Sequence, residues 1–483
     1  MTASPAAARN LEVPLCVDLD GTLVKGDTLV ECAVALARRN PLLLCLLPFW
    51  LLRGRAYLKY KLASAAAIAA DRLPYRKEIV EFLRQERERG RKVVLVTAAD
   101  QQVAQAVADH LGVFEETYGS DRQTNLKGAA KASHLVSLFG EKGFDYVGDS
   151  DADYAVWRQA KNAVVVGSQS MADRAAKCAP VAKHFPTSRP SLLTFLRSVR
   201  IHHWSKNALV FLPVILSHSA QGVKWKMASL GFLLFGTCAS GLYVFNDLLD
   251  LHSDRTHPWK SHRPFASGEL PLWLGALGSI ALVMGTLAIS FWLHPYFAAV
   301  LTGYAALTIL YSWRIKRWVL ADVFVLASFY GIRIVAGAVI TATPLSQWFL
   351  AFCGFFFLSL AMAKRNSELL HAKEQVLNGD SGRAYTIEDR DLLTVFGVAS
   401  AFCSVVILAL YAHSPEVMAL YGRPTTLLWL CPLILYWLSR MWLLAHRGTL
   451  NEDPVSFALR DRTSLVLGLA ALLILVGANL HWA

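Results

Sequence analysis

The sequence is short of charge. Only 17% of its 483 residues are Asp, Glu, Lys or Arg, whereas 54% are hydrophobic and 14 are Trp. A purely soluble protein of this length needs a larger polar surface, so the composition indicates membrane spans. The net charge of +12 suits nucleic acid or an anionic membrane surface. Because the basic residues cluster beside apolar runs, we expect a membrane protein with anionic substrates and no nucleic acid.

Paired cysteines and an export signal are also missing. The eight Cys are scattered, and no two have the CxxC spacing of a zinc or disulfide site. The first residues, MTASPAAARNLEVP, lack the basic region and apolar core of a secretory signal. We therefore expect the chain to start in the cytoplasm. A length of 483 residues predicts two or three domains.

The first part of the chain alternates short apolar runs with charged helical stretches. PLCVDLDG, RKVVLVTAAD, FDYVGDS and NAVVVGS read as strands that end in polar turns, and YRKEIVEFLRQERERG has helical periodicity. This alternation predicts an α/β domain with a parallel, doubly wound sheet over residues 1–190. Residues 191–205 are the expected linker to a second domain at 206–483.

One apolar segment interrupts the α/β pattern. PLLLCLLPFWLLRGRAYLKYKL, residues 41–62, has an apolar run of about thirteen residues, too short to cross a bilayer, and basic residues follow it. Two interpretations stay open: a buried cap helix, or an interfacial helix that rests on the membrane.

The second part of the chain has the pattern of an all-α membrane bundle. Basic loops alternate with short, nearly uncharged ones, so the positive-inside rule places the basic loops and the N-terminal domain in the cytoplasm of a bacterial plasma membrane. We predict nine spans, near 206–222, 227–251, 271–292, 296–313, 319–341, 345–363, 392–412, 424–445 and 463–481.

The first motif with chemistry is DLDGTL, which follows the first predicted strand. Asp18 can attack phosphorus, and Asp20 can protonate the leaving oxygen and later activate water. Together with the later strings VLVTAAD, NLKGAAK and GDSDAD, this string resembles the haloacid dehalogenase superfamily of phosphatases. The resemblance implies a Rossmann-like domain with a helical cap, Thr97 as a phosphate-binding residue and Lys127 as its neutralising lysine, with Lys131 as the alternative. The ligands implied for one Mg²⁺ are Asp18, Asp20 through its carbonyl, Asp149 and Asp153. A degenerate, inactive domain is the other interpretation.

A second acidic motif, NDLLDLHSD, closes the second predicted span. On one helix, Asp247, Asp250 and Asp254 share a face. Carboxylates toward lipid are costly, so we expect them in a bundle interior or a wet cavity. Hard oxygen ligands beside bases suit Mg²⁺ and a diphosphate leaving group.

NDxxDxxxD followed by HPxKxxRP resembles the UbiA-type intramembrane prenyltransferase superfamily. Most members have a second acidic motif, DxxxD, but the matching stretch here, residues 311–333, has the single acid Asp322 among bases. The strings RIHHWSKNALVFLPVIL, YSWRIK, MAKRNSEL and NEDPVSFALRDR resemble the decaprenyl-phosphate phosphoribosyltransferase branch instead. That branch implies phosphoribosyl pyrophosphate as donor, a polyprenyl phosphate as acceptor and one or two Mg²⁺. We expect Asp322 to steady a ribose hydroxyl or a second metal. The expected substrate-binding residues are Lys206, Asn246, Lys260, Arg263, Tyr311, Lys316, Arg333, Lys364, Arg365 and Glu368, the last of which orients Arg365.

The two domains together predict a bifunctional enzyme that transfers 5-phosphoribose to the lipid phosphate and then removes the 5-phosphate. One alternative is a prenyltransferase that uses a polyprenyl diphosphate and an aromatic or other small acceptor beside an unrelated or inactive phosphatase-like domain. Another is a membrane scaffold without activity. The sequence leaves open whether the chain forms a homo-oligomer.

Overall fold

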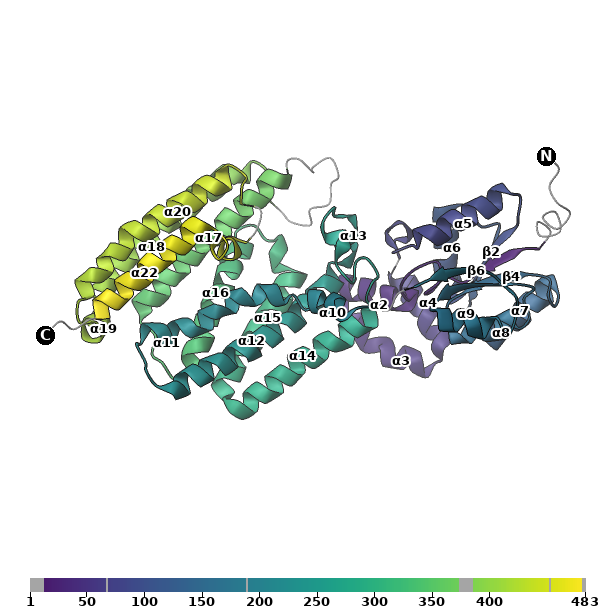
Figure 1. Cartoon of the computed structure of the whole chain (residues 1–483), viewed down its shortest axis with the longest axis horizontal. Coiled ribbons are helices and arrows are strands. Elements are labelled where there is room, and N and C mark those ends of the chain that lie inside the picture. Colours follow the sequence, from purple (N-terminus) through teal and green to yellow (C-terminus); the bar gives the residue numbers. More distant parts are fainter. Residues whose placement is uncertain (1–12, 67, 188–189, 373–384, 451–452, 480–483) are drawn as a thin grey trace. The chain divides into compact units, whose positions relative to one another are not determined.

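The computed structural model describes residues 13–66, 68–187, 190–372, 385–450 and 453–479 (Figure 1). The chain forms two compact units, each assembled from separate stretches. The first unit combines residues 1–198 with residues 247–277, and the second combines 199–246 with 278–483. The segment that carries the second acidic motif therefore belongs to the same unit as the N-terminal domain.

The first unit is built on a six-stranded sheet with the order β3-β2-β1-β4-β5-β6, in which every neighbouring pair is parallel. The predicted parallel sheet is thus confirmed. In the centre, Val17 lies opposite Leu95 and Val147, so the carboxyl ends of β1, β2 and β4 share one edge. The strands are β1 (Leu15–Val17), β2 (Val93–Asp100), β3 (Glu116–Ser120), β4 (Asp145–Gly148), β5 (Ala163–Gly167) and β6 (Val181–Pro186).

Alternation along the central strands places a core on each face of this sheet. Leu15 and Val17 face one core, which includes residues of α5 (Lys77–Glu88) and α6 (Gln101–Leu111). Cys16, Val94 and Val96 face the other core, which includes residues of α7 (Ala129–Phe139), α8 (Tyr154–Trp157) and α9 (Gln169–Ala175). This two-sided burial is the reason that the strands read as continuous apolar runs.

A helical cap lies between β1 and β2. It consists of α2 (Thr28–Arg39), the 3-10 helix η1 (Pro41–Leu46), α3 (Leu47–Leu52) and α4 (Arg55–Ala66). Leu43, Leu44, Leu47 and Trp50 pack against the domain core. No residue of η1 or α3 is fully buried, however, so the interpretation of this segment as a buried cap helix is wrong for its outer face.

The segment 247–277 completes the first unit. It contains α13 (Leu251–Thr256) and the 3-10 helix η5 (Lys260–His262). Arg255 of α13 forms an ion pair with Glu31 of α2, with 2.6 Å between Nη2 and Oε1. Its Nη1 and Nε also donate to the carbonyls of Arg72 and Ala266, each at 3.1 Å. The segment is therefore attached to the cap by a buried, charge-assisted contact.

The second unit is helical. Among the described residues, eight stretches are long and apolar enough to cross a membrane, so the predicted ninth span is not confirmed. The helices in these stretches are α12 (Gly222–Leu249), α14 (Leu272–Leu293), α15 (Pro295–Trp313), α16 (Ala321–Ile340), α17 (Gln347–Ala372), α18 (Asp389–Ala412), α20 (Leu430–His446) and α22 (Arg462–Asn479).

The stretch predicted as the first span, 206–222, forms two short helices instead. The 3-10 helix η4 (Ile201–Phe211) leads into α11 (Leu212–Leu216), which has Pro213 in its first turn. Residue 210 packs so closely on α16 that a Cβ at Gly337 would lie 2.1 Å from the Val210 carbonyl oxygen. A glycine on α16 thus permits the contact that holds this irregular segment against the bundle.

Candidate active sites

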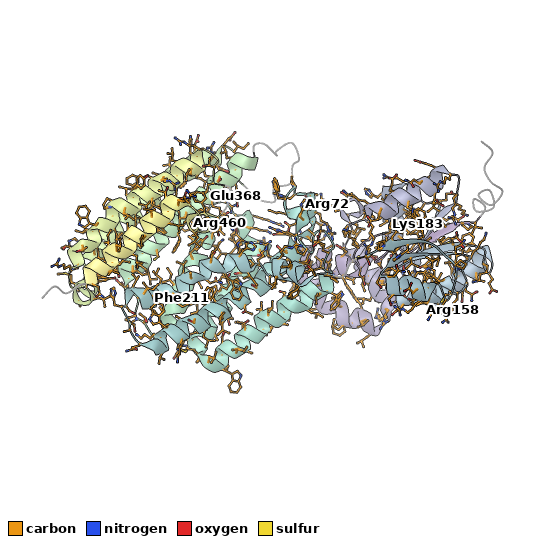
Figure 2. The ribbon with its side chains drawn as sticks, viewed as in Figure 1. Arg72, Arg158, Lys183, Phe211, Glu368 and Arg460 are labelled. Carbon is orange, nitrogen blue, oxygen red and sulfur yellow. The ribbon has the colours of Figure 1, made fainter. Side chains whose placement is uncertain are left out.

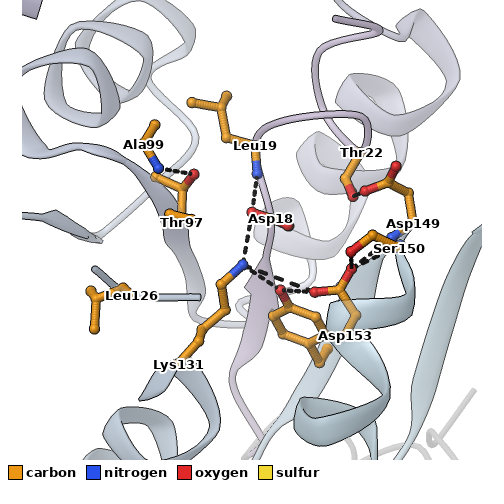
Figure 3. Close-up of polar contacts among 12 residues, drawn as sticks. Asp18, Leu19, Thr22, Thr97, Ala99, Leu126, Lys131, Asp149, Ser150 and Asp153 are labelled. Atoms are coloured by element: carbon orange, nitrogen blue, oxygen red, sulfur yellow. Dashed lines mark hydrogen bonds and ion pairs between the residues drawn. The ribbon is translucent and has the colours of Figure 1, made fainter. Parts of the chain in front are cut away.

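Three acids meet at the carboxyl edge of the sheet in the first unit (Figure 3). Carboxylate oxygens of Asp18, Asp149 and Asp153 all lie within 4.8 Å of one another. Asp18 directly follows β1, and Asp149 directly follows β4, so the parallel sheet brings them together. Gly21 is required here, because it has a φ of +76° and a Cβ would lie 2.1 Å from Asp149 Oδ2.

A buried lysine completes this acidic cluster. Lys131 Nζ on α7 lies 2.9 Å from Asp18 Oδ1, and its side chain is 3% exposed. Lys127, the lysine first expected from the motif, is exposed. The structure therefore brings the alternative, Lys131, to Asp18, and its neutralising role stays a prediction.

Asp153 is held by hydrogen bonds from the turn that carries Asp149. Its Oδ2 accepts from the backbone N–H of Asp149 at 3.1 Å and from the N–H and hydroxyl of Ser150 at 2.9 and 2.8 Å. Its Oδ1 accepts from the Tyr146 hydroxyl at 2.9 Å. These contacts fit a residue that shapes the turn, while its role as a metal ligand stays a prediction.

The electrostatics of the cluster fit a bound cation. Burial, together with the neighbouring Asp18 and Asp153, raises the pKa of Asp149 to about 8. Burial also raises the pKa of Asp18, against the effect of Lys131. Converging carboxylate oxygens are the donors that Mg²⁺ prefers. Asp18 and Asp149 are the residues that would hold this ion, which would offset the charge of a bound phosphate.

Asp20 lies between the acidic cluster and the cap. Its Oδ1 accepts from the backbone N–H of Thr28, in the first turn of α2, at 2.7 Å. Burial, together with the neighbouring Asp27, raises its pKa to about 7. The same carboxylate lines a small pocket with three other polar residues, Lys59 of α4, Thr28 and Asp100, and the remaining lining residues are Leu29, Cys32, Ala63, Ala99 and Val103.

Two further polar groups belong to this neighbourhood. Thr97 is fully buried, and its hydroxyl accepts from the Ala99 N–H at 3.0 Å within the part of β2 where the register with β3 shifts. Lys59 Nζ donates to the Ala98 carbonyl at 2.5 Å and to Asn125 Oδ1 at 2.8 Å. Sequence reasoning gave Lys59 no role, because its place in the pocket depends on how the cap folds back over β2.

The second acidic motif, also in the first unit, does not form one continuous helical face. α12 ends at Leu249, and Asp250 has a backbone conformation (φ −90°, ψ 7°) that separates α12 from α13. The Arg263 guanidinium bridges Asp247 at 3.1 Å and Asp254 at 2.5 Å. Within the described part of the chain, these acids do not gather into a three-ligand cluster. Their role as metal ligands stays a prediction.

The second unit contains a buried charged cluster on Asp453. Lys206 Nζ of η4 lies 2.9 Å and Lys364 Nζ of α17 lies 3.3 Å from Asp453 Oδ2. The Tyr330 hydroxyl of α16 lies 2.8 Å from each carboxylate oxygen. Burial alone would raise the pKa of Asp453, but Lys364 and Lys206 hold it well below its usual range. Side chains from three separate elements thus converge on one carboxylate at the start of α21 (Pro454–Ala458).

Asp322, the single acid of the stretch 311–333, is paired with an arginine. Arg365 Nη2 lies 2.5 Å from Asp322 Oδ2, and the exposed fractions of the two side chains are 2% and 0%. The Tyr385 hydroxyl donates to the other carboxylate oxygen. Arg365 also pairs with Glu368, which Figure 2 labels on α17. The contact between these two is the one that the sequence led us to expect.

The remaining expected substrate-binding residues lie in different surroundings. Arg333 is 3% exposed, and its Nε donates to Asn207 Oδ1 at 2.9 Å, which favours a structural role. Tyr311 packs edge-on against Phe329, with 5.6 Å between ring centroids. Three others are half-buried near helix ends: Asn246 in the last turn of α12, Lys260 in η5 and Lys316 in η6 (Ile315–Arg317).

Comparison with known proteins identifies both parts of the chain. The model of the UbiA prenyltransferase family matches residues 208–465. The chain belongs to the UbiA prenyltransferase family. The model of haloacid dehalogenase-like hydrolases matches residues 15–158, so this UbiA protein also carries a hydrolase domain. The eight apolar helices and the family together indicate an integral membrane enzyme.

Relatives of this UbiA protein are of two kinds. The uncharacterized protein y4nM of Sinorhizobium fredii is 38% identical over 95% of this chain and 89% of its own length, so it shares both parts. Two others cover a smaller share of this chain. Nodulation protein NoeC of Azorhizobium caulinodans is 35% identical over 58% of this chain and 91% of its length. Decaprenyl-phosphate phosphoribosyltransferase of Mycolicibacterium smegmatis is 31% identical over 57% of this chain and 89% of its length.

Within the UbiA part, sequence reasoning missed Asp453 and Tyr330. Asp453 lies in the motif NEDPVSFALRDR, but an Asp before a Pro is an ordinary helix N-cap, and it does cap α21 here by accepting from the Val455 N–H at 3.2 Å. The bases on η4 and α17 are far away in the sequence. No local spacing could therefore reveal that Asp453 holds Lys206 and Lys364 together.

Proposed function

We propose that this UbiA-type enzyme transfers 5-phosphoribose from phosphoribosyl pyrophosphate to a polyprenyl phosphate such as decaprenyl phosphate, and that its N-terminal domain then removes the 5-phosphate. The observation that carries the proposal is the pairing of Asp322 with Arg365. A prenyl diphosphate donor is expected to need two sets of acidic metal ligands. Here Asp322, the acid at the position of the second set, is neutralised by the buried Arg365. Bases around a single acid suit substrates that carry several phosphates.

The transfer step needs no protein nucleophile. An oxygen of the lipid phosphate attacks the anomeric carbon of the donor, and the bond from that carbon to the diphosphate oxygen breaks. Mg²⁺ held by Asp247, Asp250 and Asp254 would supply charge stabilisation for the diphosphate. Arg263 lies beside two of these acids, and we expect it to bind a diphosphate oxygen. The exposed part of the Lys364 side chain, 29%, lets this base bind a second phosphate.

The phosphatase step uses the acids of the first unit. Asp18 attacks the phosphorus of the 5-phosphate, and the ester oxygen leaves with a proton from Asp20. A pKa of about 7 leaves Asp20 partly protonated near neutral pH, as this donor role requires. Water then attacks the aspartyl phosphate, Asp20 takes a proton from that water, and inorganic phosphate leaves. Lys131 and Thr97 are the expected phosphate-binding groups.

The direct test is product analysis with the full chain in lipid nanodiscs, polyprenyl phosphate and radiolabelled phosphoribosyl pyrophosphate. We expect wild type to form polyprenyl-phosphoryl ribose, Asp18→Asn to accumulate its 5-phosphate, and Asp247→Ala to form neither. Asp151→Asn, an acid of the same loop with a side chain 75% exposed, is the matched control and should resemble wild type. If Asp18→Asn accumulates no phosphorylated lipid, the coupled reaction is refuted.

The family description favours a second candidate, a prenyltransferase with a polyprenyl diphosphate donor and an aromatic or other small acceptor. Supplying each donor separately and measuring released diphosphate distinguishes the two. We also propose that both sites face the cytoplasm of a bacterial plasma membrane, where the basic loops are expected. Labelling of engineered cysteines in intact cells tests this orientation.

A further inference from the structure

The outer face of the cap segment Pro41–Leu52 is unusually apolar for a surface. Leu42, Phe49 and Leu52 are 77%, 64% and 85% exposed, while neighbours on the other face pack against the domain core. Leu46 and Leu51 extend the exposed face. A contiguous apolar face on a monomer surface marks a contact site for a membrane or another molecule.

The charge around this face is of one sign. Residues 32–70 contain no Asp or Glu and six Lys or Arg. Exposed arginines stand on both sides of the apolar segment: Arg38 and Arg39 before it, and Arg53 and Arg55 after it. A two-helix segment with leucines and a phenylalanine outward and arginines at its borders has the composition of an element that lies in the headgroup region of anionic lipids.

We propose that the outer face of Pro41–Leu52 rests on the anionic surface of the bilayer and thereby presents the phosphatase pocket to phosphate esters carried by lipids. The eight apolar stretches keep the chain at a membrane, and the segment is too short to cross it. The proposal rests on the proposed function in one respect, the lipid nature of the phosphatase substrate.

The two helices that flank the docking face, α2 and α4, also line the pocket. α2 leads into this segment and contributes Leu29 and Cys32 to the pocket, and α4 leaves it and contributes Lys59 and Ala63. A cap seated on the bilayer would therefore bring Asp20 and its pocket to the lipid surface.

A second copy of the chain is a poorer occupant of this face. A two-fold contact would place the exposed Arg38, Arg39, Arg53 and Arg55 of one copy near those of the other. Like charges at such an interface oppose association, whereas anionic headgroups attract all of them. The bilayer therefore satisfies both the apolar and the basic parts of the surface.

The first experiment measures how deeply the segment Pro41–Leu52 lies in the bilayer. Full chain with Cys45→Ser and Cys403→Ser receives a nitroxide at Phe49→Cys in nanodiscs containing phosphatidylglycerol, and a control label at Glu88→Cys on α5. We expect the label at 49 to relax faster with oxygen than with a water-soluble nickel complex, and the label at 88 to show the reverse. A water-exposed label at 49 overturns the proposal, as does a label shielded from both reagents and broadened by a second spin, which would indicate a second copy.

The second experiment measures turnover. The triple variant Leu42→Gln, Phe49→Gln, Leu52→Gln should raise KM for the 5-phosphorylated lipid in vesicles roughly tenfold, because three apolar contacts with the bilayer are lost. Hydrolysis of soluble p-nitrophenyl phosphate should be unchanged, and Leu138→Gln, at a leucine 41% exposed on α7, should change neither. An equal loss on both substrates overturns the proposal. If wild type itself ignores the lipid, the proposed function fails while the depth measurement still decides the docking.

Discussion

The contact between Arg255 and Glu31 offers a quantitative test of how the segment 247–277 is held. The two side chains are 7% and 2% exposed, and the guanidinium contacts the carboxylate through both Nη2 at 2.6 Å and Nη1 at 3.1 Å. Removing one partner of a buried ion pair typically costs about 3–5 kcal/mol, because the other charge stays buried without compensation. Arg255→Met should therefore shift the equilibrium between attached and detached segment by a factor of at least about 100.

Hydrogen–deuterium exchange of the full chain in nanodiscs measures this shift directly. Peptides from α13 and η5 should lose protection in Arg255→Met, while peptides from the central strands keep theirs. The double variant Glu31→Met, Arg255→Met removes both charges and should recover most of the protection. Arg174→Met breaks an exposed pair with Asp151, at side-chain exposures of 52% and 75%, and should cost no more than about 1 kcal/mol.

Two results would refute this reasoning about the buried pair. Unchanged protection of α13 in Arg255→Met would mean that other contacts of the segment hold it. A double variant no better than the single one would mean that the lost hydrogen bonds to the carbonyls of Arg72 and Ala266 dominate, and not the buried carboxylate.

Three further predictions concern the two sites. Lys131→Met should abolish hydrolysis of p-nitrophenyl phosphate, whereas the exposed Lys127→Met should lower it less than about tenfold; equal losses would contradict the predicted role of Lys131. The pKa of Asp149 is raised to about 8 from an ordinary value of 3.8. Without metal, its carboxyl group therefore contributes stability that is fully present below about pH 4 and is lost as pH rises through 8. Because Mg²⁺ binds the ionised form, the rise in Tm on adding Mg²⁺ should grow from pH 6 to pH 8.5 in differential scanning fluorimetry, and a constant rise would argue against a metal there. Asp453→Asn should destabilise the protein by about 3 kcal/mol, because Lys206 and Lys364 lose their buried counter-charge. Asp461→Asn, which removes the ion pair with Arg440, should cost about 1 kcal/mol. Unfolding in detergent measures both changes in stability.

The sheet shows where a sequence predicts well. β1, β2, β4 and β5 are buried on both faces, so they appear as apolar runs, and their ends carry Asp18 and Asp149. The edge strands β3 and β6 are partly exposed and have the mixed sequences ETYGS and VAKHFP, which lack a clear period. Their pairing depends on the neighbouring strand and not on their own composition.

The membrane part shows a different limit. The stretch 206–222 has enough apolar residues to suggest a span. However, Lys206 forms an ion pair with Asp453, and Asn207 accepts a hydrogen bond from Arg333. Pro213 lies in the first turn of a new helix. Each of these partners lies far away in the sequence. The span predicted here from apolar content is therefore not confirmed, because tertiary contacts decide the length of the helices.

The lysine of the phosphatase site was left between two candidates for a similar reason. Lys127 and Lys131 are four residues apart, but α7 begins only at Ala129, so the two side chains do not share a helix face. Where the helix begins decides which lysine reaches Asp18. The Gly128 that precedes it, with a φ of +57°, marks that start.

The division of the first unit between two stretches of sequence bears on how the protein is made. Residues 1–198 leave the ribosome first, and domains near the N-terminus generally fold first. Glu31 then stays hydrated until α12 has been synthesised and Arg255 follows it. The phosphatase domain is thus completed only after the first long apolar helix has entered the membrane, and a fragment ending at residue 198 should be less stable than the same domain in the full chain.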